Sequence, residues 1–499
     1  MSIHAQEATY FLHTVERGQT LYSLSQMYKI SQESIIKLNP GSDKGIQTGT
    51  SLKIPQESGS YFYHTIQPKE TLYSVSRQYQ MKGEDIIAVN PGLSIETFSI
   101  GKIIRIPTNK VTTPIEGTNE AYNMSITNAL LNADNQVNNI NSLRVALLLP
   151  FGLKEGTTPK NAATNRMVEY YEGILLALED IKKSGISVDL QVYDTGSEVN
   201  LLNGILQKTA LQNVHLIIGG LSDKQIKLIA SFASDKKIPY IIPFTSKSDE
   251  PLNNHYVYQI NTPQSYLYSK ASAAFCNQYK RSNIIFYIPK DDGNKTDFVE
   301  TLQKDLKAKY MSYKVIGTSN DLLAEIQGVV SENANNVFIP ADDRRETLLK
   351  LMTPLKGLLD AQPQLSVSMF GYPAWQTYAT DYTDDFFRLD ASFFSVFYAN
   401  PTSPKVKSFN NLYQRWYSRE LINIFPKYGM LGYDTGLYFI QSLQKYGTLF
   451  EINPNRLNYK GVQMDFYFEQ VNNWGGFINT NIYWVEFNPN FTITSKSVN

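Results

Sequence analysis

Apolar and polar positions change rhythm twice along the 499-residue chain. From residue 10 to 107, short β-forming runs alternate with short amphipathic stretches of helical spacing. From residue 143 onward, longer apolar runs alternate with longer helical patterns. Residues 109–142, between these parts, are rich in Thr and Asn and show no firm periodicity. The pattern predicts small N-terminal units, a flexible or lightly helical linker and a large C-terminal domain.

The N-terminal part contains an internal repeat. Residues 11–55 align with residues 62–107 at an offset of 51, and the second copy gains one residue near its end. Both copies contain Thr-Leu-Tyr-Ser, then Asn-Pro-Gly, then a last apolar run that ends in Ile-Pro. β-Formers open each copy, the Thr can cap a first helix, and the Pro stops a second helix. The repeat therefore predicts two small β-α-α-β units, at residues 10–56 and 61–108.

The two copies resemble LysM domains. The resemblance rests on the Gly-Gln-Thr-Leu-Tyr-Ser run, the Leu-Asn-Pro run and the terminal Leu-x-Ile-Pro of the first copy, with their counterparts in the second. It implies binding of the N-acetylglucosamine of peptidoglycan or chitin, in a groove between the first strand–helix loop and the loop after the second helix. Carried over to this sequence, the implied glycan-binding residues are Gly18, Gln19, Thr20, Leu21, Pro40, Gly41 and Ile46 in the first copy, and Glu70, Thr71, Leu72, Pro91 and Gly92 in the second.

The second copy departs from this pattern in its first loop. It has Pro68-Lys69-Glu70 where the first copy has Arg17-Gly18-Gln19, so the loop glycine is lost. A structural interpretation also stands beside the functional one, in which the Thr, Asn and Pro side chains only cap helices and form turns, and the backbone that they shape binds the glycan. Two weak modules on one chain would gain from effective concentration on a polymer.

Residues 143–490 predict a doubly wound parallel α/β domain. Apolar strands such as Leu143–Phe151 and Val214–Ile218 alternate with amphipathic helices such as Arg166–Ser184. Continuous apolar strands between amphipathic helices are typical of a parallel sheet that is covered on both faces. The number of strands indicates two lobes, which we divide near residue 263.

This part resembles the type I periplasmic-binding proteins of the branched-chain amino-acid receptor kind. The resemblance rests on local sequences that include Tyr171-Glu172-Gly173, Ile217–Ser222 and Leu431–Gly436. It implies a ligand between the lobes, at the carboxyl ends of the strands, where open α/β sheets bind ligands. The matching inter-lobe cleft positions are Leu221, Ser222, Thr245 and Ser246.

Several residues depart from the amino-acid receptors. Asp223 follows the expected serine position, where an acid would repel a ligand carboxylate. Lys290–Asn294 replaces the Tyr-Gly of the second lobe, and no Asp or Glu near Gly371 matches the partner of a ligand amine. We therefore expect no amino-acid ligand. A similar fold without ligand occurs in outer-membrane regulators of peptidoglycan synthases, and this resemblance implies partner contacts instead.

Composition and charge exclude several classes of protein. Lys+Arg and Asp+Glu are both 46, so the chain lacks the basic excess of a nucleic-acid binder. No stretch approaches the roughly 20 apolar residues of a membrane span. The one cysteine, Cys276, rules out an intramolecular disulfide, and the five histidines form no HxxxH or HExxH pair. We expect no metal site and no cofactor.

Some patterns suggest an enzyme. Asp-Thr-Gly occurs at Asp194 and at Asp434, as in aspartic proteases, but those enzymes need all-β lobes. Asp342-Asp343 and Asp384-Asp385 are pairs of adjacent acids, which usually mark a solvated turn or helix start. No G-x-S-x-G elbow or P-loop is found. The sequence therefore predicts a protein that is not an enzyme.

Together these patterns predict a non-catalytic cell-envelope protein of the periplasm or cell wall. It would bind peptidoglycan through its repeats and present the bilobed domain to a partner protein or a small ligand. Ser2–Gln6 resembles the end of a signal peptide, so we expect an export signal that has been removed or trimmed. The alternatives are an extracytoplasmic solute receptor and a cell-wall hydrolase.

Overall fold

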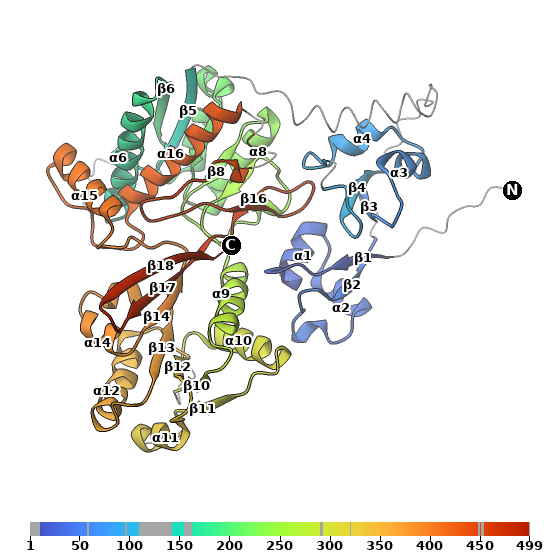
Figure 1. Ribbon diagram of the computed structural model, residues 1–499. Helices are drawn as coiled ribbons and strands as arrows, with labels where there is room; N and C mark the ends of the chain where they lie inside the picture. The colour runs from blue at the N-terminus through green and yellow to red at the C-terminus, as the bar shows by residue number, and fades with distance from the viewer. Residues whose placement is uncertain are drawn as a thin grey trace.

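The computed structural model describes residues 10–56, 59–94, 97–108, 142–153, 162–289, 293–319, 321–447, 450 and 454–498. Two small units and a larger domain of two α/β lobes follow one another along the chain (Figure 1). The predicted fold class is thereby confirmed. The predicted linker lies outside the described residues, apart from Ser142, which opens the first strand of the large domain.

Each repeat is a two-stranded antiparallel sheet that carries two helices. The strands alternate inward and outward, so Phe11, Leu52 and Ile54 meet Leu24 and Ile35 of the helices in the core. The elements of the first repeat are β1 (Tyr10–Thr14), α1 (Leu21–Tyr28), α2 (Gln32–Leu38) and β2 (Ser51–Pro55). Those of the second are β3 (Tyr61–Thr65), α3 (Leu72–Gln78), α4 (Gly83–Ala88) and β4 (Ile103–Pro107).

Lobe one is built on a sheet in the order β15-β16-β9-β8-β7-β5-β6, parallel except for the β15–β16 pair. Alternate residues of strand β5 enter cores on opposite faces, Leu147 on one and Leu148 on the other. The elements are β5 (Ser142–Leu149), α6 (Ala162–Lys183), β6 (Ser187–Asp194), α7 (Val199–Leu206), β7 (Leu216–Gly219), α8 (Asp223–Lys236), β8 (Tyr240–Ile242), β9 (Val257–Gln259), α15 (Pro404–Tyr417), α16 (Tyr428–Tyr446), β15 (Phe468–Gln470) and β16 (Phe477–Asn479).

Lobe two has a sheet in the order β11-β10-β12-β13-β14-β17-β18, whose last two strands run antiparallel to their neighbours. The sequence did not predict these antiparallel strands. The elements are α9 (Gln264–Gln278), β10 (Asn283–Tyr287), α10 (Thr296–Ala308), β11 (Tyr313–Ile316), α11 (Leu322–Val329), β12 (Asn336–Pro340), α12 (Arg345–Ala361), β13 (Val367–Gly371), α13 (Trp375–Tyr378), α14 (Thr383–Arg388), β14 (Ser392–Ser395), β17 (Ile482–Asn488) and β18 (Thr492–Val498).

The chain passes between the lobes more than once. It crosses from β9 to α9, returns from β14 to α15, and crosses again from β16 to β17. The first crossing lies at the boundary predicted near residue 263. Because the chain then returns, residues 404–479 belong to lobe one, and one boundary does not separate the lobes.

Helices α6 and α16 of lobe one cross at unusually close range. A Cβ on Gly173 of α6 would lie 1.9 Å from the carbonyl oxygen of Gly429, and one on Gly432 of α16 would lie 2.0 Å from the carbonyl oxygen of Tyr170. Small residues let two helix backbones approach in this way. The Tyr-Glu-Gly and Leu-Gly-Tyr-Asp-Thr-Gly sequences that marked the family resemblance are therefore two sides of one packing contact.

Replacing Gly173 by Ala should destabilise lobe one by about 1–3 kcal/mol, because the methyl group forces the helices apart. Gly204 of α7 is the matched control, since a Cβ there meets nothing within 4 Å. Gly204→Ala should be neutral or stabilising by up to about 1 kcal/mol, as expected for Ala in a helix. Urea unfolding followed by circular dichroism measures both variants. Equal stability of the two would contradict the packing argument.

Candidate glycan-binding site

A buried histidine braces the first loop of repeat one. His13 Nε2 lies 2.7 Å from Gln19 Oε1, which also accepts from the backbone N–H of Glu16 at 2.9 Å. Because that oxygen only accepts, Nε2 carries the proton, and Nδ1 accepts from the Tyr28 hydroxyl at 2.8 Å. Burial lowers the pKa of His13 despite the Gln19 contact, so the ring is neutral at pH 7. The loop is therefore held rigidly.

Repeat two builds the same brace with a carboxylate. His64 Nε2 donates to Glu70 Oε2 at 2.7 Å, the same oxygen accepts from the N–H of Gln67, and His64 Nδ1 pairs with the Tyr79 hydroxyl. The equivalent positions are 51 residues apart in every case. Gln19 and Glu70, both predicted to bind glycan, thus hold their own loops in shape.

The other predicted glycan residues divide into structural and exposed groups. Thr20 and Thr71 form capping boxes with the third residue of each first helix, as the structural interpretation expected. Leu72 is buried in the core of repeat two. Pro40, Gly41 and Pro91 are exposed on the loops that follow the second helices.

Three further predicted residues contact the large domain. A Cβ on Gly18 would lie 2.5 Å from the ring of Tyr266 in α9, and the carbonyl oxygen of Ile46 lies 3.4 Å from Lys304 Nζ. Gly92 donates its N–H to the carbonyl oxygen of Asn473 at 2.8 Å. The sequence had predicted a flexible or lightly helical linker between the repeats and the large domain, with no contact between them specified. In the structure the large domain lies against one side of both predicted grooves.

The contact between the three parts is centred on Arg105 and Trp474. The guanidinium of Arg105 lies 4.4 Å from the Trp474 ring centroid and 4.9 Å from that of Tyr61, and Nη2 donates to Asn253 Oδ1 at 2.7 Å. Only 7% of Arg105 is exposed. Tyr63 packs on the same indole at 5.5 Å between centroids. Strand β4 of repeat two is thereby fixed to the 471–476 turn of the large domain.

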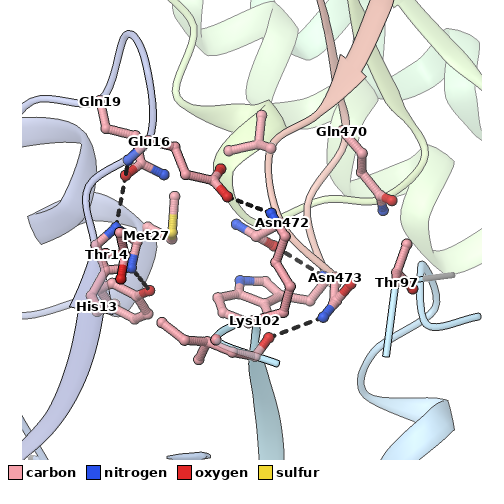
Figure 2. A pocket seen from close by; sticks show the side chains of 15 residues that line it. His13, Thr14, Glu16, Gln19, Met27, Thr97, Lys102, Gln470, Asn472 and Asn473 are labelled. Carbon is pink, nitrogen blue, oxygen red and sulfur yellow. Dashed lines mark hydrogen bonds and ion pairs between the residues drawn. The ribbon is translucent and has the colours of Figure 1, made fainter. Parts of the chain in front are cut away.

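A small pocket lies where the two repeats meet the large domain. Figure 2 shows His13, Glu16 and Gln19 on one side, Thr97 and Lys102 from repeat two, and Asn472 and Asn473 from the turn. Glu16 and Lys102 form an ion pair across the opening. The pocket volume is about 120 Å³, well below the roughly 300 Å³ of typical ligand sites. We interpret this pocket as a gap in the contact between the repeats and the large domain.

Sequence reasoning missed both central residues of this contact. Arg105 occupies the position of Lys53 in repeat one, which stacks on Tyr10 at 5.0 Å as Arg105 does on Tyr61. The alignment of the two repeats could therefore have revealed that each repeat carries a cation and an aromatic ring at equivalent positions. Trp474 lies in Asn-Asn-Trp-Gly-Gly, where a tryptophan inside a turn sequence is an unusual signal.

The predicted inter-lobe cleft residues lie at the carboxyl ends of β7 and β8. Ser222 caps α8 by accepting from the N–H of Gln225. The Gln225 carboxamide accepts from the N–H of Leu221 at 3.3 Å and donates to the Gly196 carbonyl at 2.9 Å. Thr245 accepts from the N–H of Lys247, and Ser246 is half-buried beside it. The N-terminus of α8 is thus partly closed by side chains of the protein itself.

A carboxylate of the protein occupies the next strand end. Asp194, at the end of β6, accepts from the N–H groups of Phe151, Gly152, Leu153 and Gly196 at 2.8–3.1 Å. Partial burial would raise the pKa of Asp194, but these four donors together hold it below its usual value. The backbone N–H groups that follow β5 and β6 are therefore already bonded within the protein.

The second Asp-Thr-Gly copy has a different environment. Asp434 is buried in α16 and accepts from the N–H groups of Val462, Gln463 and Met464 at 2.7–3.0 Å. Burial raises its pKa to about 6, against those three bonds and the Tyr459 hydroxyl. Asp194 and Asp434 share no hydrogen-bond partner, so they do not form the carboxylate pair of an aspartic protease.

The described residues hold no group of three or more His, Cys, Asp or Glu side chains arranged to bind a metal ion. In the same part of the chain, every helix is too short or too polar to cross a membrane.

The two small modules belong to a recognised class. Residues 13–55 and 64–107 match the family model described as LysM domain. A curated relative from Bacillus subtilis, named "Putative sporulation-specific glycosylase YdhD", is 30% identical over 112 residues. That alignment covers 22% of this chain and 25% of the relative, so the chain spans about a quarter of its length.

Solved structures similar to this chain are substrate-binding proteins of ABC transporters. One from Desulfitobacterium hafniense, in complex with Leu, has 14% identity, covers 71% of this chain and 100% of its own, and gives a TM-score of 0.41. One from Sphaerobacter thermophilus has 13% identity, 72% and 97% coverage, and a TM-score of 0.44. This is the class that the sequence resemblance named. The bilobed architecture itself is defined by the strand orders given above.

Replacing Trp474 by Ala should release the repeats from the large domain, because the Arg105 guanidinium loses the aromatic ring that the large domain supplies. The amide of Gly92 reports this directly, since its acceptor is the neighbouring Asn473 carbonyl. Hydrogen exchange at that amide should become at least about tenfold faster. Trp416→Ala is the control, because Trp416 is 53% exposed on α15. Unchanged exchange in the Trp474 variant would refute the role of this contact.

Replacing Asp194 by Asn should lower the melting temperature at pH 7. The pKa of Asp194 is depressed in the folded state, so its stabilisation is full above about pH 4 and is lost as the pH falls through the folded-state pKa. The difference between wild type and variant should therefore shrink as the pH is lowered through the depressed folded-state pKa of Asp194. Asp189→Asn, at an exposed position on the same strand, should show no such pH-dependent difference.

Proposed function

We propose that this chain is a non-catalytic, extracytoplasmic binding protein that attaches to the N-acetylglucosamine of peptidoglycan through its two LysM modules. The LysM match over both repeats carries this proposal. Each module is braced internally by the same His, Tyr and Gln or Glu set, so its groove loops keep one shape. A rigid loop loses little entropy when it binds a sugar.

The predicted grooves are open on the side of their second loops. Pro40, Gly41 and Pro91 are exposed there, while Gly18 and Gly92 face the large domain. Glycan would therefore approach from the side of the exposed Asn-Pro-Gly turns. Because both modules are fixed to the same turn of the large domain, two grooves would be offered to a glycan at a set spacing, which raises the effective concentration of the second.

In this proposal, the bilobed domain binds a partner protein or a small ligand. The receptor alternative for amino acids is disfavoured by Asp223, which follows the expected serine position and would repel a ligand carboxylate. The two Asp-Thr-Gly sites give the hydrolase alternative no support, because Asp194 and Asp434 bind separate sets of backbone N–H groups and do not pair with each other. An envelope protein partner or an uncharged ligand remains the proposed target of this domain.

Co-sedimentation of the full chain with purified sacculi tests the attachment. Wild type should pellet, and a Pro40→Glu/Pro91→Glu double variant should bind about tenfold or more weakly, because a charge in each groove loop opposes burial against a sugar ring. Lys37→Glu/Ala88→Glu is the matched control, since these equivalent exposed positions lie one turn earlier on the second helices. The control should pellet like wild type.

Three results would count against the proposal. Wild type that stays in solution refutes glycan attachment. Equal pelleting of both double variants shows that the Asn-Pro-Gly turns are not the binding surface. Soluble muropeptides released from the sacculi during the same incubation would instead support a hydrolase.

A further inference from the structure

A second and larger cavity lies on the flank of the two lobes. Lobe two contributes α13, α14 and the β17–β18 turn, and lobe one contributes α15, residues 420–427 and Met430 in the first turn of α16. Figure 1 shows α14 and α15 on the same side of the molecule, one in each lobe. The cavity measures about 700 Å³ and shares no residue with the predicted cleft positions after β7 and β8. It is therefore a separate space.

The inner wall of this cavity is apolar. Phe387, Val406, Met430 and Phe487 line it and are each at most 7% exposed. A volume of this size with mainly apolar walls is typical of sites that enclose small organic molecules, which span roughly 300–1,000 Å³. The walls come from both lobes, so an occupant would contact both.

Two polar groups on the wall have no partner in the described part of the chain. Tyr398 is 8% exposed, and burial alone raises the pKa of its hydroxyl, with no hydrogen bond or nearby charge contributing. Its ring is fixed against Phe393, with 5.9 Å between centroids, and its N–H donates to the Gln463 carbonyl. Gln376, 5% exposed, leaves its carboxamide oxygen unpaired. The Gln376 oxygen is fully buried, so the Tyr398 hydroxyl is the unpaired group of the two that a molecule in the cavity would reach.

The charged side chains on the cavity wall are unsuited to an ionic ligand. They are Glu420, which is exposed, and Lys427, whose Nζ already donates to the Ile422 carbonyl at 3.0 Å and to Asn423 Oδ1 at 3.1 Å. A buried carboxylate or ammonium would need a dedicated counter-charge. The lining therefore favours an uncharged molecule.

We propose that this cavity binds a small uncharged amide with an apolar body, whose carbonyl accepts a hydrogen bond from the Tyr398 hydroxyl. The apolar body fills the space between α14 and α15, and the carbonyl satisfies a donor that the protein leaves free. The proposal is independent of glycan attachment, because no residue of the LysM modules lines the cavity.

Ligand-observed NMR and calorimetry on the full chain test the site. The probes are a panel of uncharged aromatic and aliphatic amides headed by acetanilide, with N-ethylaniline as the analogue that lacks the carbonyl, and benzoate and leucine as charged competitors. Acetanilide or another amide of the panel should bind. Its carbonyl-free analogue should bind about tenfold more weakly, and the charged compounds should not compete.

Variants locate the bound amide. Tyr398→Phe removes only the hydroxyl and should weaken binding about three- to tenfold, and Ala399→Phe, on the same wall, should block it. Tyr310→Phe, at a site that is 98% exposed in lobe two, should bind like wild type. The proposal is overturned if no amide binds, if leucine or benzoate binds as tightly, or if affinity is unchanged in Tyr398→Phe or in Ala399→Phe. Melting temperatures of all variants show that they are folded.

Discussion

The arrangement of the three domains depends on the buried guanidinium of Arg105. A cation removed from water is costly unless aromatic faces and hydrogen-bond acceptors replace its hydration. Here Tyr61 comes from repeat two, while Trp474 and Asn253 come from the large domain. Arg suits this place because its planar group stacks and donates at once, which an ammonium does less well. The equivalent Lys53 of repeat one stacks on Tyr10 at the exposed surface. The cation that is buried against the large domain is therefore the one in repeat two.

Local sequence predicted the elements well where periodicity and caps agree. Both repeats form the expected β-α-α-β order, because Thr20 and Thr71 cap the first helices and apolar positions alternate in the strands. The longer parallel strands of both lobes, such as β5 and β7, were recognised as continuous apolar runs, whereas the short strands β9, β14 and β16 were not. The antiparallel strands β17 and β18 escaped notice, since the sheet edge mixes exposed Thr and Lys with inward residues. The place of β17 is set by pairing with β14, nearly a hundred residues earlier, and β18 pairs in turn with β17.

The candidate site shows where sequence reasoning must stop. The sequence singled out Gln19 and Glu70 as glycan-binding positions. In the structure their side chains bond to His13 and His64 and hold the shape of their own loops. That distinction depends on contacts six residues apart, and the aligned histidines hinted at it. The closeness of Gly18 to Tyr266 and of Gly92 to Asn473 depends on contacts across more than two hundred residues, which no local pattern encodes.

The polar groups at the strand ends of the lobes have hydrogen-bond partners, whereas, among the described residues, two on the flank lack them. At the strand ends, Asp194, Ser222 and Gln225 satisfy the free backbone donors, which stabilises the fold and leaves little for an anionic ligand. On the flank, Tyr398 and Gln376 keep polar atoms without partners beside an apolar space. Since an unpaired buried group opposes folding, a cavity that keeps one is a better place to look for a ligand than an edge that has satisfied its own. We therefore place the proposed ligand in the flank cavity, which is lined by residues of α14 and α15, and not at the ends of β7 and β8.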